Sequence, residues 1–460
     1  MFKQWHNWRQ KSRYREVSRV CIPLVTGMAA TTVMEFTDRI FLSHYSVDAL
    51  SAVVPAGVTV FLILCFLGGI AGYVTVFIAQ YQGAGHPEKI GTALWQGIFF
   101  TAFSGVILLL IAYFVSGPLF KLFGHSPEVR VLEEQYFMIL CQGGVLHVAI
   151  QPFSGFFTGR GMTRPVMIAN IVGMLVNIPL NYALINGIWG MPELGIRGAA
   201  IATVIAWGVI VLCLAPPIFS KRFRTDFRLF ETMALNRDIL LKLFRFGVPG
   251  ALQFSLDIFA FTFFIILVGR MGTVPLAASN IAISISSIAF MPALGFSFGI
   301  SSMTGKALGS GRPEEARSAA WSGIHLLMIY TLLLDALFFF QSEAIVSIFI
   351  DASEMGGNDE EILQMGSGIL KLVTLYIFLD VFYMIFAAVL KGAGDTRFLL
   401  MAIAGATLCC MLIPLYVGIN YLGMTIYIAW GCIVFFISTL CLLISLRYRG
   451  GKWERMLVIE

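Results

Sequence analysis

Five carboxylates lie inside long apolar segments of the chain: Glu35, Asp38, Asp257, Asp335 and Asp380. An ionised side chain at the centre of a membrane costs at least about 3 kcal/mol, so an acid kept there is a functional hypothesis by default. We interpret Asp38, Asp257 and Asp380 as functional acids that bind a cation or carry a proton. Asp335 fits a structural role better, and Glu35 fits either role.

Asp257 and Asp380 are predicted to meet at the same membrane depth. Each lies about 13 residues into its apolar segment, or roughly 20 Å along a helix, and the two segments enter from opposite faces. In a hydrocarbon core roughly 30 Å thick, both carboxylates then reach the central zone. We therefore expect one cavity to hold both acids, where they would share one cation, such as Na⁺, or one proton.

A second polar constellation surrounds Asp38 in the first half of the chain. Asn177 and Asn181 are four residues apart, so they share one helical face. Amide and carboxylate oxygens suit a hard cation such as Na⁺, and they suit an ordered proton relay equally well. Glu35 lies one turn before Asp38, and the adjacent Arg39 is a candidate partner for either acid.

These acids need a membrane bundle to position them. The chain has 460 residues, of which 58% are hydrophobic and 12% charged, and a mean hydropathy of +0.84, which excludes a soluble globular protein. A spanning helix needs roughly 20 apolar residues. Twelve segments qualify, near residues 17–41, 51–80, 91–117, 132–158, 165–188, 197–219, 242–269, 275–305, 317–341, 367–390, 398–420 and 424–446.

The two halves of the chain repeat one loop. Residues 83–88 read Gly-Ala-Gly-His-Pro-Glu, and residues 309–314 read Gly-Ser-Gly-Arg-Pro-Glu; Trp95 and Trp321 follow at the same spacing. The loops follow no strand and lack the lysine–hydroxyl pair of a phosphate-binding loop, so we interpret them as a helix stop followed by a helix that starts at proline. A repeated loop between apolar segments is typical of a duplicated transporter bundle.

The repeat predicts the domain organisation. We expect an all-α membrane protein with twelve transmembrane helices in two six-helix lobes, residues 1–219 and 242–460, joined by a polar linker at 220–241. Because each half has an even number of helices, the lobes form a parallel repeat about a pseudo-twofold axis along the membrane normal. We expect a central cleft between the lobes that opens to one side at a time.

The distribution of Lys and Arg predicts the orientation. With both termini cytoplasmic, 25 of the 31 basic residues fall on the inner side. We therefore predict a multi-pass protein of the inner (plasma) membrane, and we read the net charge of +5 as topology rather than as a nucleic-acid interface. No HExxH or GxSxG motif and no zinc-type cysteine spacing is present, so a membrane-embedded enzyme has little support.

Several motifs resemble those of the MATE (multidrug and toxic compound extrusion) family of antiporters. They include Pro23, the Phe36-Thr37-Asp38 run, and the repeated glycine–proline loop. The resemblance covers residues 17–447, and the stretches 175–181 and 192–195 are similar to the NorM-like branch of the family. So are Asp257, eight residues after Pro249, and the Tyr376…Asp380 pair.

The resemblance implies a cation site at Asp257 and Asp380, with Tyr376 beside it, and a first-half site at Asp38. Two positions depart from the family pattern. That branch usually has Glu at the position of Asp257, and archaeal-type members carry an acid where this chain has Asn181.

The combined interpretation is a secondary active antiporter that exports amphipathic, cationic organic compounds in exchange for Na⁺ or H⁺. We expect no cofactor besides the coupling ion, and a monomer whose partners are its substrate, a monovalent cation and the lipid bilayer. Within the same superfamily, a flippase for lipid-linked precursors is the alternative; it usually has a cationic cavity, whereas the cleft expected here carries acids.

Overall fold

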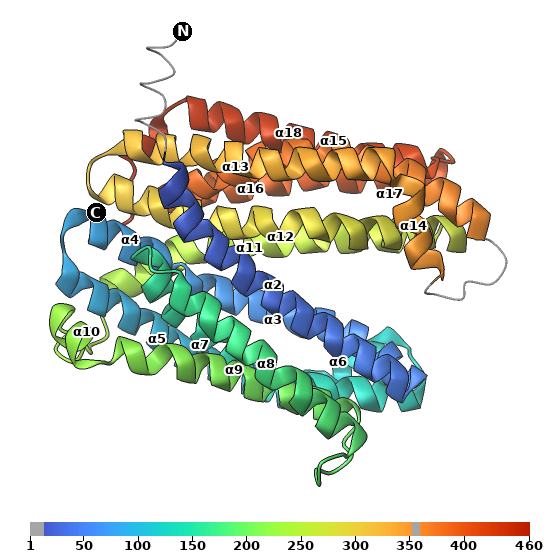
Figure 1. Cartoon of the computed structure of the whole chain (residues 1–460), viewed down its shortest axis with the longest axis horizontal. Coiled ribbons are helices and arrows are strands. Elements are labelled where there is room, and N and C mark those ends of the chain that lie inside the picture. The colour runs from blue at the N-terminus through green and yellow to red at the C-terminus, as the bar shows by residue number, and fades with distance from the viewer. Residues whose placement is uncertain (1–12, 352–358) are drawn as a thin grey trace. The chain divides into compact units, whose positions relative to one another are not determined.

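The computed structural model describes residues 13–351 and 359–460, and every regular element in this part of the chain is helical (Figure 1). Twelve helical spans are long and apolar enough to cross a membrane, which confirms the twelve predicted segments. Two spans are composite: a break at Tyr73 divides one into α3 and α4, and a π-helical turn (η1) just before Pro414 lies between α16 and α17. Proline cannot donate a backbone hydrogen bond, which accounts for the irregular turn.

The spans comprise fifteen helical elements. They are α2 (Tyr14–Tyr45), α3 (Val47–Gly72), α4 (Val74–Ala84), α5 (Pro87–Phe114), α7 (Pro127–Gly159), α8 (Arg164–Asn186), α9 (Ile196–Ile218), α11 (Arg237–Gly269), α12 (Thr273–Gly309), α13 (Pro313–Phe340), α15 (Asp359–Ala393), α16 (Thr396–Ala406), η1 (Thr407–Leu412), α17 (Ile413–Tyr421) and α18 (Ile426–Arg449). Short helices outside the spans are α6 (Ser116–Phe123), α10 (Lys221–Asp226), α14 (Ser342–Asp351) and the 3₁₀ turn η2 (Lys452–Arg455).

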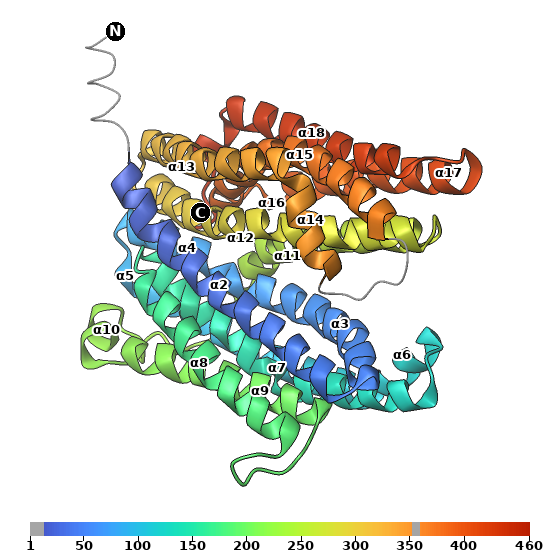
Figure 2. The ribbon, with the colours of Figure 1, turned by 45° about the vertical axis from the view of Figure 1, so that its right-hand side comes forward.

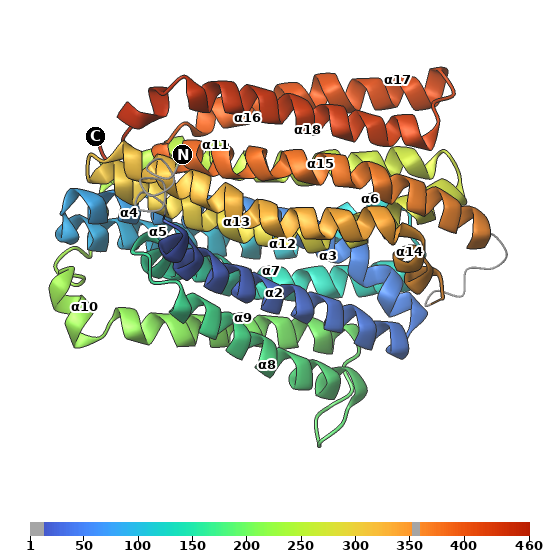
Figure 3. The same cartoon turned by 45° about the horizontal axis from the view of Figure 1, so that its top comes forward.

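The packing divides the chain into two compact units. We call residues 22–251, 305–311 and 457–460 the first unit, and residues 1–21, 252–304 and 312–456 the second unit. Besides residues 22–219, the first unit includes residues 220–251, 305–311 and 457–460. In the first unit α7 packs against α3, α5 and α9; in the second unit α15 packs against α13 and α18, and α16 and α17 lie beside α18 (Figure 3).

The repeated loops have the predicted geometry. α4 ends before Gly85, which has the left-handed φ of 73° that glycine tolerates, and α5 begins at Pro87. Gly311 has φ of 68°, and α13 begins at Pro313. A helix stop followed by a proline start therefore explains both loops without a ligand.

Two repeated glycines make a reciprocal close contact inside the first unit. A methyl group on Gly83 would collide with the carbonyl of Lys306, and one on Gly309 would collide with the carbonyl of Gln80. Gln80 and Lys306 occupy equivalent positions of the repeat, three residues before each glycine. Only residues without a side chain allow these two helix ends to approach so closely.

The segment between α9 and α11 is hydrogen-bonded to α5. Trp95 Nε1 donates to the Leu229 carbonyl (2.6 Å), and Gln96 bonds the Ala234 carbonyl and the Asn236 amide. Figure 2 shows α10 beyond one end of α9, with the α8–α9 connection at the opposite end. The linker that the sequence predicts to be polar is thus a docked segment of the first unit.

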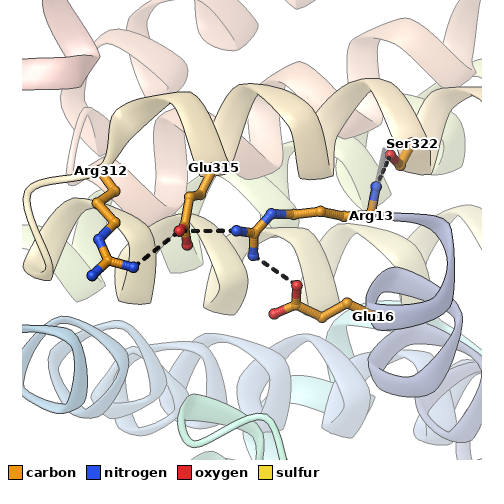
Figure 4. A network of polar contacts seen from close by, with 5 residues as sticks. All are labelled: Arg13, Glu16, Arg312, Glu315 and Ser322. Carbon is orange, nitrogen blue, oxygen red and sulfur yellow. Dashed lines mark hydrogen bonds and ion pairs between the residues drawn. The ribbon is translucent and has the colours of Figure 1, made fainter. Parts of the chain in front are cut away.

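An ion-pair network anchors the start of α2 within the second unit (Figure 4). Arg13 pairs with Glu16 (2.7 Å) and Glu315 (2.9 Å), and its backbone amide donates to the Ser322 hydroxyl (3.0 Å). Arg312 shares Glu315 (3.2 Å). These bonds explain why the first turns of α2 group with α13.

Candidate functional site

Asp38 is enclosed by neutral polar groups from two other helices. Its side chain in α2 is only 6% exposed and accepts hydrogen bonds from Asn181 Nδ2 of α8 and from Thr203 Oγ1 of α9 (3.1 Å). Hydrogen bonds to an ionised acceptor are among the stronger ones in proteins. The structure therefore brings together the Asp38 and Asn181 that the sequence places 143 residues apart.

Asn177 lies one turn before Asn181 and is fully buried. Among the described residues, neither its amide nitrogen nor its amide oxygen has a hydrogen-bond partner, and the Asn181 oxygen has none either. A buried polar group without a partner costs about 1–3 kcal/mol. Unpaired amide oxygens in the same site as a carboxylate and a hydroxyl are the donor set that a Na⁺ ion or an ordered water needs.

Glu35 and Arg39 lie outside this hydrogen-bonded set. Both are exposed, although the charge of Glu35 interacts with that of Asp38. No ion pair joins Arg39 to either acid in the described structure. Arg39 therefore does not neutralise Asp38 by direct contact.

Asp257 and Asp380 lie near each other in the second unit. They lie on α11 and α15, are both partly exposed, and are close enough for their charges to interact. The hydroxyl of Tyr383, one turn after Asp380, hydrogen-bonds to Asp257, and Gln253 hydrogen-bonds to the same tyrosine. The second-half site is thus a pair of acids, one of which is held by a buried phenol.

Tyr376 lies one turn before Asp380 and is buried. Its hydroxyl contacts Ser286 of α12, and its ring lies within electrostatic reach of Asp380. Tyr376 therefore forms part of the surroundings of Asp380, while Tyr383 contacts Asp257 directly.

The intramembrane acids form no ion pair within residues 13–351 and 359–460. None of the ion pairs among the described residues includes Glu35, Asp38, Asp257, Asp335 or Asp380. The same part of the chain has no group of three or more His, Cys, Asp and Glu residues that could hold a metal ion. The charge of Arg39 reaches Glu35 and Asp38 without an ion pair in the described structure, so direct neutralisation of these acids requires a bound cation or a proton.

Asp335 stays apart from both sites. It is partly buried in α13, and its Oδ1 has no hydrogen-bond partner among the described residues. No contact links it to Asp257 or Asp380 in that part of the chain.

Three polar residues of the sites were not recognised from the sequence: Thr203, Gln253 and Ser286. Thr203 is a single hydroxyl in the apolar run of α9, and nothing local marks it. Gln253 did leave a signal, because it lies four residues before Asp257 and therefore on the same helical face.

The chain is similar to known proteins along its whole length. The profile of the MatE family matches residues 23–183 and 249–417, one match in each half. A relative named "Probable multidrug resistance protein NorM", from Thermotoga maritima, is 27% identical over 475 aligned positions that cover all of this chain and 98% of the relative.

Solved structures share the fold. An outward-facing multidrug resistance MATE family transporter of the MOP superfamily superposes with a TM-score of 0.86 at 22% identity, covering 96% of this chain and 97% of that one. A MOP superfamily transporter from Pyrococcus furiosus, described as having a binding pocket of reverse polarity, also gives 0.86 at 22% identity, covering 95% and 96%. The eukaryotic MATE transporter AtDTX14 gives 0.84 at 17% identity, covering 97% of both chains.

The family match covers both halves of the bundle, and the solved relatives have the two-lobe fold. Members of this family are transporters and not enzymes. The twelve-helix chain therefore belongs to the MATE family of multi-pass membrane transporters.

Proposed function

We propose that the chain is a secondary active antiporter that exports amphipathic, cationic organic compounds in exchange for Na⁺ or H⁺. The observation that supports this most strongly is Asp38, a buried carboxylate whose hydrogen-bond partners Asn181 and Thr203 are both neutral. A lone ionised carboxylate inside a membrane is costly. Binding one monovalent cation or one proton removes that cost, which is the property a coupling site requires.

The amide oxygens of Asn177 and Asn181 support a cation in this role. Both are buried and unpaired among the described residues, so a Na⁺ ion bound at Asp38 would find neutral oxygen ligands beside the carboxylate. A proton would instead neutralise Asp38 directly and leave these oxygens to water. Either Na⁺ or H⁺ therefore neutralises Asp38.

In the second unit, Asp257 and Asp380 together bind a cation. Two interacting acids that are partly exposed can attract a cationic substrate from water, and they can share one coupling ion. The buried tyrosines Tyr376 and Tyr383 add aromatic surface next to the acids, which favours organic cations. An anionic lipid-linked precursor would meet repulsion at this pair, so the flippase alternative is disfavoured.

The decisive experiment is transport in proteoliposomes with imposed gradients. Export of a fluorescent organic cation would be followed under a Na⁺ gradient at equal pH, and under a pH gradient without Na⁺. We expect one of the two gradients to drive uphill export. Transport of a lipid-linked substrate, with no export of organic cations under either gradient, would replace the proposal by the flippase.

We also propose that both termini are cytoplasmic in the inner membrane, that the protein works as a monomer, and that the lobes 1–219 and 242–460 alternate in access to the two sides. The distribution of basic residues supports the orientation. Labelling of single cysteines at Ser220 and at Glu193, from inside and outside intact cells, tests it. Reaction of the Ser220 site from outside would reverse the assigned orientation.

Alternating access predicts a separable contact at the repeated loops. Gly83 and Gly309 make a reciprocal contact with Lys306 and Gln80, so cysteines at Ala84 and Ser310 should cross-link readily. After replacement of the eight native cysteines, we expect this cross-link to block export and reductant to restore it. Undiminished export with the cross-link complete would favour bending within one lobe, for example at Pro23 in α2.

A further inference from the structure

The docked linker of the first unit carries a pocket that the transport sites do not use. It is lined by Arg224, Thr225, Arg228, Phe230 and Glu231 and has a volume of about 530 Å³. Arg224 stacks on the ring of Phe230 at 4.5 Å, and Arg228 lies 3.7 Å from Glu231 with both side chains strongly exposed. Two guanidinium groups therefore face one small concave surface.

The linker is held at the membrane surface by its two ends. α9 ends at Ile218 and α11 begins at Arg237, and both helices are membrane spans. The linker lies on α5, where Trp95 and Gln96 bond its backbone. The pocket must therefore lie near the headgroups of whichever leaflet the linker faces.

A rigid aromatic platform supports this segment. Arg160, at the end of α7, lies over the rings of Phe156, Phe223 and Phe227 at 4.4–4.9 Å. Burial lowers the pKa of Arg160, its Nη1 has no hydrogen-bond partner in the described structure, and its guanidinium carbon lies over all three rings. Such stacking fixes Phe223 and Phe227, which flank Arg224 in the chain.

The exposed surface of the linker is both basic and apolar. Lys221, Arg222 and Arg224 are exposed, and no acid lies within ion-pair distance of them among the described residues. Three large apolar side chains are at least half exposed a few residues away: Phe230 (50%), Met233 (53%) and Leu235 (66%). Cations beside exposed apolar groups match the boundary between anionic headgroups and acyl chains.

From this arrangement we infer that the linker pocket binds the phosphate headgroup of an anionic membrane lipid. Arg224 and Arg228 contact the phosphate, Phe230 forms the wall of the pocket, and Met233 and Leu235 lie against the acyl chains. Guanidinium groups suit this ligand because their donors match phosphate oxygens. Glu231 is the one acid in the lining, and its exposed side chain can turn away from an arriving anion.

The test measures lipid binding to the purified full-length chain without any transport. Thermal unfolding in detergent micelles would be followed while phosphatidylglycerol, phosphatidylcholine or inorganic phosphate is added. We expect phosphatidylglycerol to raise the unfolding midpoint by roughly 5 °C at saturation. Phosphatidylcholine and inorganic phosphate should produce little change.

Matched variants locate the effect. The pair R224Q/R228Q should lose most of the stabilisation by phosphatidylglycerol, and R224K/R228K should keep a large part of it. The pair R449Q/R455Q removes two exposed arginines near the C-terminus, so it should respond like wild type. Native mass spectrometry should show fewer retained phosphatidylglycerol molecules for R224Q/R228Q alone, which separates lost binding from a general loss of stability.

Three results would overturn the inference. Equal loss in R449Q/R455Q would reduce it to nonspecific attraction by positive charge. An equal shift with inorganic phosphate would mean a free-anion site, and an equal shift with phosphatidylcholine would mean a general lipid effect. Because no readout depends on export, the inference and the proposed antiport fail independently.

Discussion

Both acid sites place carboxylates inside the membrane, but the surroundings of these carboxylates differ. Asp38 is a single acid that is almost fully enclosed and held by neutral groups of α8 and α9. Asp257 and Asp380 are a pair that remains partly open and has tyrosines beside it. The enclosed site offers a carboxylate, a hydroxyl and unpaired amide oxygens, whereas both acids of the pair remain partly exposed.

From this contrast we expect the two halves to bind different cations. A single buried acid must be neutralised by something that fits among Asn177, Asn181 and Thr203, which favours H⁺ or Na⁺ over a substrate. Two acids with interacting charges can hold one cation between them and change partner when the substrate arrives.

The largest effect is expected for D38N. Asparagine keeps the shape of the side chain but removes both its charge and its titration, so ion-coupled export should fall by about 100-fold, the upper range of a typical coupling energy. The measurement is initial-rate export in proteoliposomes under the driving gradient. D48N, which removes an exposed acid at the start of α3, is the control and should export normally. Wild-type export by D38N would move the coupling ion away from the enclosed site.

D257N and D380N should each lower export by about 30-fold, somewhat less than D38N, because one acid of the pair remains. The double variant should be little worse than either single variant, since both acids serve one cation. Export assays on all three variants measure this. D335N removes a partly buried acid of α13 that contacts neither site and should stay near wild type. Strictly additive losses in the double variant would mean two separate sites.

Variants that lose a neutral polar group near Asp38 should weaken ion binding to an intermediate degree. T203V removes the hydroxyl that donates to Asp38, and we expect the ion concentration for half-maximal export to rise about tenfold; N177A should raise it about fivefold. The maximal rate at saturating ion should change less, because the carboxylate remains. A larger loss of export in N177A than in D38N would contradict a carboxylate-centred site.

The smallest effect is expected for Y383F. It removes the hydroxyl that bonds Asp257 but keeps the buried ring, and water can replace this bond in a partly open site. The apparent affinity for the organic cation should therefore fall only about threefold. Binding would be measured by fluorescence titration, with Y416F, a change on an exposed tyrosine of α17, as the control. A fall in apparent affinity of about 30-fold, as large as the fall in export expected for D257N, would show that the second site is as enclosed as the first.

Much of the architecture could be predicted because it depends on short stretches of the sequence. The spans follow from runs of apolar residues, and the helix stops at Gly85 and Gly311 follow from the glycine–proline loops. The meeting of Asp257 and Asp380 could be estimated from helix rise and membrane thickness alone. The docking of the linker could not be predicted, because it depends on Trp95 and Gln96, which lie more than 130 residues before their partners.

The sequence by itself determined that twelve helices form two repeated halves and that acids lie at membrane depth, since both depend on hydropathy and spacing along the chain. Only the tertiary structure decided which neighbours each acid meets. It placed Thr203 beside Asp38, Tyr383 beside Asp257, and Glu35 at an exposed position one turn away. The physical reason is that rotation and crossing of packed helices select the facing side chains, and these follow from close packing of the whole bundle rather than from any local pattern.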